Sequence, residues 1–306
     1  MPNKSYLFSI LSEDLPYKEL RAIKDSFIPG VKKVLKDNNL KFENLEFHFS
    51  RNRFGFLLDN CMEKQPDFEE SIWGPPKKVC FDKDSNPTRA LEGFCRKFYI
   101  EPKDIEFSDK KGREYVLINR KVTGARTEDV LKKELPPIVN SIPFSRKMNL
   151  DNKQEFIRPV RRVLFLKEDE IIRFNLLSVD SARSTLIDNF SKEVEIPSAK
   201  EYFKKLEELK ISVRHSERKE YISKMLKEIT RESGSQIKYD DDQLDYIAFL
   251  SESPMLMEGT FKKEFLYLPA ELITSTLWKH QKCLGWFKDN SIQNRFITVV
   301  DSKCDP

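Results

Sequence analysis

The apolar residues of this chain change their spacing twice within the first sixty residues, and this limits the possible folds. Residues Tyr6 to Ile10 form a short apolar run that is typical of a β-strand. Strand patterns return at Leu45 to Phe49 and at Phe54 to Leu58. Between them, apolar residues recur every three or four positions, as along one face of a helix: Leu20, Ile23, Phe27, Val31, Val34 and Leu35. Together these patterns predict a β-α-β-β unit at residues 1–65.

A second unit is expected at residues 66–110. The stretch from Cys61 to Phe81 contains prolines and a glycine but no periodicity, so we expect a linker or an ordered loop there. Pro87 can open a helix, because the first turn of a helix does not need its missing N–H, and apolar residues at helical spacing follow it. The second unit should therefore consist of a loop and a small helical part.

The third expected unit, residues 111–306, is a central mixed α+β region. Val160 to Leu166 and Ile171 to Val179 are apolar runs joined by four charged residues, which indicates a β-hairpin. A helical insertion is expected at about residues 198–250, where apolar residues return to helical spacing. We thus expect the α+β fold class, with several small mixed domains, a central hairpin or sheet region, and helical segments towards the C-terminus.

Positive charge is concentrated in one segment. The net charge of the 306 residues is only +4, which excludes a diffusely polybasic binder. Between Ser141 and Leu166, however, there are six Lys and Arg side chains and two acidic ones, so this segment alone has a net charge of +4. A local basic patch is the electrostatic pattern of a phosphate-binding surface. The candidate RNA contacts in it are Arg146, Lys147, Arg158, Arg161 and Arg162.

The arginines at the start of the predicted hairpin cannot all contact one phosphate backbone. Successive side chains of a strand point to opposite faces, so Arg158 and Arg162 share one face and Arg161 lies on the other. A structural alternative for Arg158, beside Pro159, is a buried ion pair that holds the hairpin together. Arg161 and Arg162 have the same structural alternative.

The sequence lacks the patterns of common catalytic and cofactor sites. None of the nine glycines lies in a phosphate-binding loop motif, and the five cysteines are scattered without metal-ligand spacing. The acidic run Asp240 to Asp242 is explained by a favourable interaction with a helix N-terminus. His280 is in phase with apolar residues, and we expect it to be partly buried. We predict no catalytic residue, no metal site and no cofactor in this chain. Since neither a signal peptide nor a spanning helix is evident, we predict a cytoplasmic protein.

Short sequence blocks follow one another in a characteristic order along the chain. The strongest pair is Ile142 to Met148 followed by Phe156 to Val160. The others are Leu11 to Pro16, Asn52-Arg53, Trp73 to Pro76, Phe81-Asp82, Pro87 to Ala90, Gly93-Phe94, Glu252 to Pro254, Gly259 to Phe261, Phe265 to Pro269 and His280 to Lys282. In composition and order these blocks resemble the β subunit of the two-subunit bacterial glycyl-tRNA synthetase. The chain departs from that pattern at Ile187 to Phe190, at Cys283-Leu284 and at Asn149-Leu150.

The resemblance implies an enzyme of two α and two β chains that joins glycine to tRNA with ATP. The α subunit of that family holds the glycine and ATP sites and uses ATP and Mg, while the β subunit binds tRNA. The expected partners are tRNA(Gly), an α subunit and a second β subunit in an α2β2 assembly, with no DNA and no membrane. The family's β chain continues past the equivalent of Pro306, so we expect a fragment or a truncated form. Three further RNA-contact candidates follow: Arg53, Lys279 and Lys282.

Two alternatives to this tRNA-binding, non-catalytic role stay open. The chain can be a docking or scaffold module that contacts the α subunit or the rest of the β subunit and touches no RNA. It can also be a stand-alone RNA-binding protein derived from the family.

Overall fold

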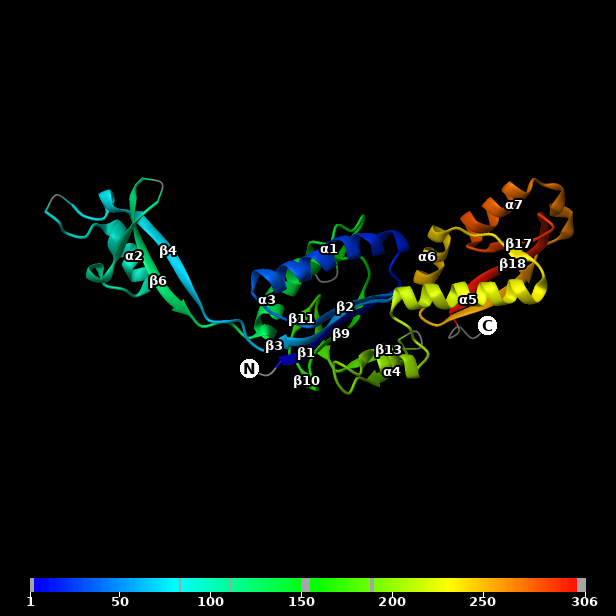
Figure 1. The fold of residues 1–306 in the computed structure, drawn as a ribbon, viewed down its shortest axis with the longest axis horizontal. Helices are drawn as coiled ribbons and strands as arrows, with labels where there is room; N and C mark the ends of the chain where they lie inside the picture. The colour runs from blue at the N-terminus through cyan, green and yellow to red at the C-terminus, as the bar shows by residue number, and fades with distance from the viewer. Residues whose placement is uncertain (1–2, 83, 111, 150–154, 188–189, 302–306) are drawn as a thin grey trace. The chain divides into compact units, whose positions relative to one another are not determined.

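The computed structural model describes residues 3–82, 84–110, 112–149, 155–187 and 190–301. The chain forms two compact units. Unit 1 consists of Met1–Glu63 together with Glu128–Pro306, and unit 2, Lys64–Thr127, is inserted between its two parts (Figure 1). The expected boundary near residue 65 lies close to the first junction. The expected boundary between residues 110 and 111 instead separates two paired strands of unit 2, and residues 1–65 are not a separate domain.

Unit 1 is built on a mixed sheet with β1 at its centre. β1 pairs antiparallel with β3 on one side and with β9 on the other, so strands about 100 residues apart in the sequence share one sheet. The strand order is β11-β12-β9-β1-β3-β2, with β10 pairing with β9. The bounds are β1 Asn3–Ser12, β2 Asn44–Phe49, β3 Arg53–Met62, β9 Val160–Lys167, β10 Glu170–Ile171, β11 Asn175–Leu176 and β12 Val179–Ala182.

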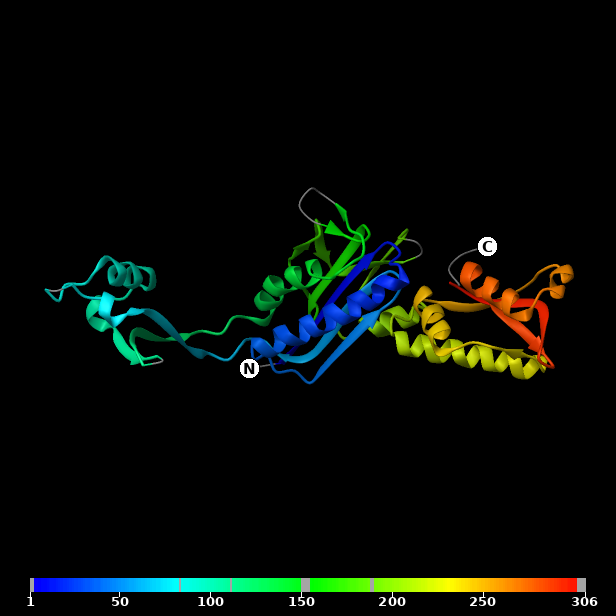
Figure 2. The same ribbon diagram turned by 90° about the horizontal axis from the view of Figure 1, so that it is seen from above.

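The sheet is buried on both faces, which explains why β1 reads as a continuous apolar run. Phe8 faces a core formed with the helices α1 (Tyr17–Asp37) and α3 (Thr127–Asn140). The neighbouring Leu7 faces a second core on the opposite side, formed with β13 (Ser184–Ile187), β14 (Lys192–Glu195) and α4 (Tyr202–Glu208). The long blue helix α1 lies along the sheet in Figure 2. The predicted β-α-β-β order is confirmed.

One local prediction in unit 1 needs correction. The hairpin expected over residues 160–179 is confirmed only at its start, where β10 pairs with β9. The chain then leaves this pairing, and β12 returns to β9 in the parallel direction. Two prolines, Pro136 and Pro137, lie inside α3. The flanking residues Leu135 and Val139 are buried in the core, and their packing favours the continuous helix.

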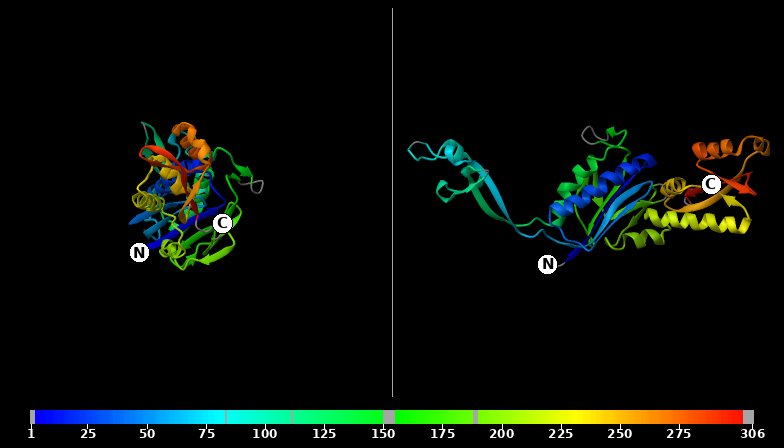
Figure 3. Two further views of the ribbon diagram at one scale, coloured as in Figure 1. Left: turned by 90° about the vertical axis from the view of Figure 1, so that its right-hand side faces the viewer. Right: turned by 45° about the horizontal axis from the view of Figure 1, so that its top comes forward.

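The C-terminal part of unit 1 combines helices with a second sheet. α5 (His215–Ser233) and α6 (Asp241–Leu250) pack against this sheet, and α5 is the long yellow helix in Figure 3. The sheet has the order β15-β17-β18-β16. The helices predicted here are confirmed, whereas the β17–β18 hairpin was not predicted. The remaining bounds are β7 Met148–Asn149, β8 Glu155–Phe156, β15 Gln236–Ile237, β16 Pro254–Thr260, α7 Ala270–Thr276, β17 Leu284–Lys288 and β18 Ser291–Asp301.

The acidic run at Asp240 begins α6, as the sequence predicts. The Asp240 side chain accepts a hydrogen bond from the Gln243 backbone N–H at 2.7 Å, and the Gln243 side chain accepts one from the Asp240 N–H at 3.0 Å. This reciprocal pair is a capping box. Asp241 forms an ion pair with Lys219 at 2.8 Å.

Asp240→Ala should lower the free energy of unfolding by about 1 kcal/mol, because the helix loses its N-cap acceptor. Urea denaturation measures this change. Asp242→Ala, which removes an exposed carboxylate from the same turn without removing the cap, is the matched control. Equal effects of the two substitutions would mean that charge near the helix terminus matters and the cap does not.

Unit 2 is a three-stranded sheet with a helix on one face. The strand order is β4-β6-β5, and the core contains Cys80, Leu91, Cys95 and Val116. The loop expected between residues 61 and 81 is wrong in its middle part, since residues 68–76 of this stretch form β4. β4 is an edge strand whose register shifts between Trp73 and Pro76, and such a position tolerates prolines without a ladder donor. The bounds are β4 Phe68–Pro76, α2 Arg89–Phe98, β5 Glu106–Asp109 and β6 Glu114–Val122.

Candidate functional site

The basic segment is held at the start of β9 by apolar anchors. Phe144, Phe156 and Ile157 are buried in the main core of unit 1. The charged residues between and beside these anchors are therefore directed outward: Arg146, Lys147 and Arg158 are all exposed. Alternation of buried aromatic and exposed basic residues thus creates a fixed positive surface.

Three of these side chains have no carboxylate partner among the described residues. Lys147 Nζ donates to the main-chain oxygen of Asn140 at 2.9 Å, and Arg158 Nε donates to that of Asp14 at 3.0 Å. Neither they nor Arg146 form an ion pair with a residue that the structure describes. The segment's Lys153 lies outside the described residues. Arg146, Lys147 and Arg158 are the candidates best placed to bind a phosphate.

Arg161 and Arg162 point to different partners, as alternation along β9 predicts. Arg161 forms an ion pair with Glu13, and Arg162 forms one with Glu193 at 2.9 Å. Arg161 also lies 5.9 Å from the ring centroid of Phe190. Their charges are already compensated, and pairs at the surface contribute little to stability.

Arg53 is not at the surface, and its burial contradicts the expectation that it contacts RNA. Its side chain lies at the start of β3 with the residue only 2% exposed. The guanidinium donates to both carboxylate oxygens of Glu252, at 3.0 and 3.2 Å, and to the main-chain oxygen of Leu186 at 2.7 Å. Burial alone would raise the pKa of Glu252, but Arg53 and Ser50 outweigh it and hold that pKa below its ordinary value.

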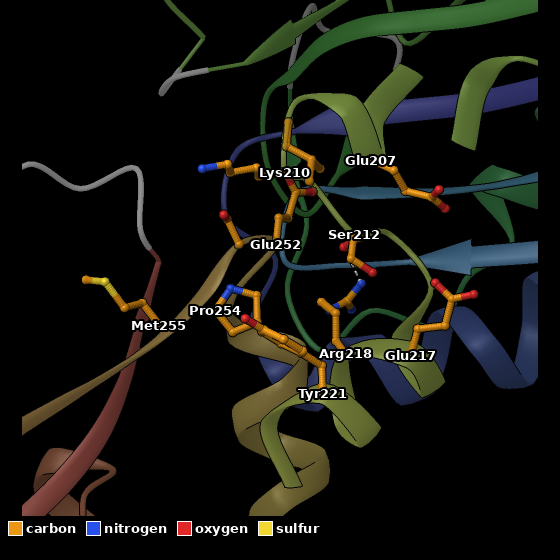
Figure 4. A pocket seen from close by; sticks show the side chains of 11 residues that line it. Glu207, Lys210, Ser212, Glu217, Arg218, Tyr221, Glu252, Pro254 and Met255 are labelled. Atoms are coloured by element: carbon orange, nitrogen blue, oxygen red, sulfur yellow. Dashed lines mark hydrogen bonds between the residues drawn. The ribbon is translucent and has the colours of Figure 1, made fainter. Parts of the chain in front are cut away.

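A second buried arginine, Arg218 of α5, joins three segments of unit 1. It donates to the main-chain oxygens of Ala248 at 2.8 Å, Ser212 at 2.7 Å and Phe49 at 2.7 Å. Burial lowers its pKa to about 10, so it stays charged at neutral pH. It also lines a pocket of about 500 Å³ beside Glu252 (Figure 4). Tyr221, Met255 and Lys210 also line this pocket.

A Ser–His pair lies inside unit 1 but cannot reach a substrate. Ser9 Oγ and His48 Nε2 are 2.9 Å apart, and Tyr202 OH is 3.1 Å from the same hydroxyl. All three residues are at most 1% exposed. Burial, reinforced by nearby arginines, lowers the pKa of His48 to about 3, so the imidazole is a weak base. This cluster is a packed polar contact between the sheet and α4.

Lys279 and Lys282 lie beside the second sheet. Lys279 is exposed, whereas Lys282 is half-buried, with its Nζ 4.9 Å from the Tyr246 ring centroid and 5.2 Å from that of Trp278. The expectation that His280 is partly buried is wrong, because it is exposed. Leu277–Gln281 forms a π-helical turn, and this wider turn takes His280 out of phase with the apolar face of α7.

The chain as a whole is similar in sequence to known proteins. A sequence model of the family described as "Glycyl-tRNA synthetase beta subunit" matches residues 6–306 of this chain. The chain belongs to the glycyl-tRNA synthetase beta subunit family. It is similar to the glycine–tRNA ligase beta subunits of Clostridioides difficile strain 630, with 29% identity over 97% of this chain, and of Limosilactobacillus reuteri strain DSM 20016, with 30% identity over 98%. The chain spans 44% of the length of each of these relatives.

Two blocks that resemble the glycyl-tRNA synthetase beta subunit family meet in the structure. Asn52-Arg53 and Glu252 to Pro254 are far apart in the sequence, and the Arg53–Glu252 ion pair joins them. Neither this pairing nor the role of Arg218 was predicted from the sequence. One signal was available for Arg218: it is in phase with Ile222, Leu226 and Ile229, so it is a charged residue on the apolar face of a helix.

The described part of this family member offers neither a metal-binding cluster nor a membrane-spanning helix. No group of three or more His, Cys, Asp or Glu side chains there has an arrangement that can hold a metal ion. Within the same residues, no helix is both long and apolar enough to cross a bilayer.

Proposed function

We propose that this chain is a tRNA-binding, non-catalytic portion of the β subunit of glycine–tRNA ligase. The observation that carries the proposal is the family match over residues 6–306, which includes the segment that exposes Arg146, Lys147 and Arg158. Guanidinium and ammonium groups without carboxylate partners bind phosphate oxygens through charge-assisted hydrogen bonds. RNA contact by this surface is thus consistent with both the family and the local geometry.

The proposal extends to the assembly in which the chain works. An α subunit would supply the ATP- and Mg-dependent chemistry, and this chain would help to attach glycine to tRNA(Gly) in a cytoplasmic α2β2 enzyme. These are roles of a whole synthetase, and the chain spans less than half of the length of the relatives above.

A docking function is the second candidate, and one observation favours it. The C-terminal part of unit 1 exposes large apolar side chains along β16 and the turn that follows: Met255 and Met257 are 47% and 49% exposed, and Tyr267 is 80% exposed. Exposed apolar residues of this size are typical of surfaces that bind another protein. This candidate predicts binding of an α subunit that does not depend on RNA.

Salt dependence tests the RNA-binding proposal. Replacing Arg146, Lys147 and Arg158 with alanine should reduce the slope of log Kobs against log salt concentration by roughly 0.7 to 0.9 for each lost phosphate contact. The physical reason is that each contact releases counterions from the RNA. Binding of the full chain to a tRNA(Gly) transcript can be measured by filter binding between low and moderate potassium chloride.

The matched control removes the same number of charges from elsewhere. Lys32, Lys33 and Lys36 are exposed on the solvent side of α1, and their alanine triple variant should change the slope much less. If the two triple variants change the salt slope equally, the change reflects the overall charge of the protein and not these three side chains. A lower melting temperature with an unchanged slope in the first triple would make these residues structural and place the RNA surface elsewhere.

A further inference from the structure

The sheet of unit 2 has α2 on one face only. Val116 points to the α2 side, where it packs with Leu91 and Cys95. Side chains alternate along a strand, so Tyr115 and Leu117 point to the other face. Trp73 of β4 lies opposite Leu117 in the register and shares that face. We call this surface of unit 2 the helix-free face.

The helix-free face carries two aromatic rings on neighbouring strands. The ring centroids of Trp73 and Tyr115 are 6.5 Å apart, with an interplanar angle of 85°. Trp73 is 37% exposed, and Tyr115 is partly exposed. Lys110 Nζ lies 4.7 Å from the Trp73 ring centroid. An exposed indole with a cation already placed above it offers a π surface beside a positive charge.

Polar groups lie along the same face. Ser71 Oγ donates to Asn119 Oδ1 at 2.7 Å across the β4–β6 pair, and both residues are exposed. Lys121 follows two residues later on β6, in register with Glu69. Aromatic rings on adjacent strands of an open sheet, with amide and ammonium groups beside them, are the features with which small sheet domains bind unpaired bases.

Charge favours a nucleic acid over a protein as the occupant. Unit 2 contains fourteen Lys and Arg residues and eleven Asp and Glu residues, so its net charge is +3 of the chain's total of +4. The helix-free face itself balances Lys110 and Lys121 against Glu69 and Glu106. Long-range attraction would therefore come from the unit as a whole, whereas local binding on this face would come from stacking.

We propose that the helix-free face of unit 2, centred on Trp73 and Tyr115, stacks unpaired RNA bases. The inference rests on the proposed RNA-binding function and adds to it a second surface with a different physical basis. Stacking accepts any base, so binding should tolerate changes of sequence but require unpaired nucleotides.

The test measures binding of the full chain to a fluorescein-labelled oligouridylate of twelve nucleotides by fluorescence anisotropy. Trp73→Ala should weaken binding about tenfold, because the base loses its stacking partner, and should leave the salt slope unchanged. Trp73→Phe should restore most of the affinity. Tyr99→Ala is the matched control, since Tyr99 is 96% exposed at the end of α2 rather than on the helix-free face. A blunt RNA duplex of the same length should bind the wild type and the Trp73→Ala variant equally.

Several results would overturn the inference. They are unchanged oligouridylate binding in Trp73→Ala, an equal loss in Tyr99→Ala, or no oligouridylate binding by the wild type. Loss of α-subunit capture in Trp73→Ala with unchanged RNA affinity would assign the face to protein docking. If the wild type binds tRNA with a steep salt slope while Trp73→Ala has no effect, this inference fails and the proposed function stands. If the wild type binds no tRNA, the proposed function itself fails.

Discussion

Arg53→Met should lower the free energy of unfolding by about 3–5 kcal/mol, because it leaves a buried carboxylate without its partner. Glu252 is 9% exposed, and its side chain is bonded to Arg53 and Ser50. The substitution also removes the donor to the Leu186 carbonyl. Urea denaturation of the full chain, followed by circular dichroism, measures the loss.

The double variant Arg53→Met with Glu252→Leu separates the charge effect from packing. Replacing both members of a buried ion pair with apolar residues is often close to neutral. We therefore expect the double variant to regain most of the lost stability. If it is as unstable as Arg53→Met, the geometry of the guanidinium and its hydrogen bonds, rather than the unpaired charge, holds this region together.

The pH dependence of the same variants has a definite sign. The pKa of Glu252 is below its ordinary value in the folded protein, so its contribution is complete above the unfolded pKa of about 4.3 and is lost as the pH falls through the folded pKa. In Arg53→Met, burial should instead raise the folded pKa, and the variant should gain stability relative to the wild type as the pH falls from 8 to 5. A variant that follows the wild-type profile would show that Ser50 and Arg218 suffice to keep Glu252 ionised without Arg53.

Arg218→Met should destabilise the protein by several kcal/mol. Its three nitrogens satisfy main-chain oxygens at Phe49, Ser212 and Ala248, and an unsatisfied buried acceptor costs about 1–3 kcal/mol. Because these oxygens belong to the end of β2, a connecting loop and α6, the loss should loosen α5 and α6 from the first sheet. Hydrogen exchange should report faster exchange in α6 than in β1.

Arg231→Met on the same helix is the control for Arg218→Met. Arg231 is exposed, so this substitution should change stability by no more than about 0.5 kcal/mol. A small effect at position 218 as well would mean that water or rearranged side chains satisfy the three oxygens. The model of Arg218 as a three-way connection would then be wrong.

The parts of the fold that the sequence predicts correctly are those set by local apolar spacing. The order of β1, α1, β2 and β3 follows from periodicity because each element buries one or both faces in the same core. β4 was missed because Pro75 and Pro76 suggest a loop, and only the pairing with β6 makes this edge strand. The β17–β18 turn at Asp289 and Asn290, both with positive φ, carried a usable hairpin signal.

The candidate site was predicted only where it depends on local sequence spacing. The outward direction of Arg146, Lys147 and Arg158 depends on nearby buried anchors, so the basic segment was found from the sequence. The partners of Arg161 and Arg53 are Glu13 and Glu252, which are distant along the chain. Such pairings depend on tertiary structure and are not contained in a local pattern.

The insertion of unit 2 sets an order of folding during synthesis. β1 lacks its neighbour β9 until the ribosome has added roughly 100 residues after β3, which takes about 5–20 s at typical bacterial rates of about 5–20 residues per second. Unit 2 is continuous in sequence and can fold during this interval. The open edge of β1 is therefore exposed on the nascent chain for seconds, and we expect a chaperone or the ribosome surface to shield it from aggregation.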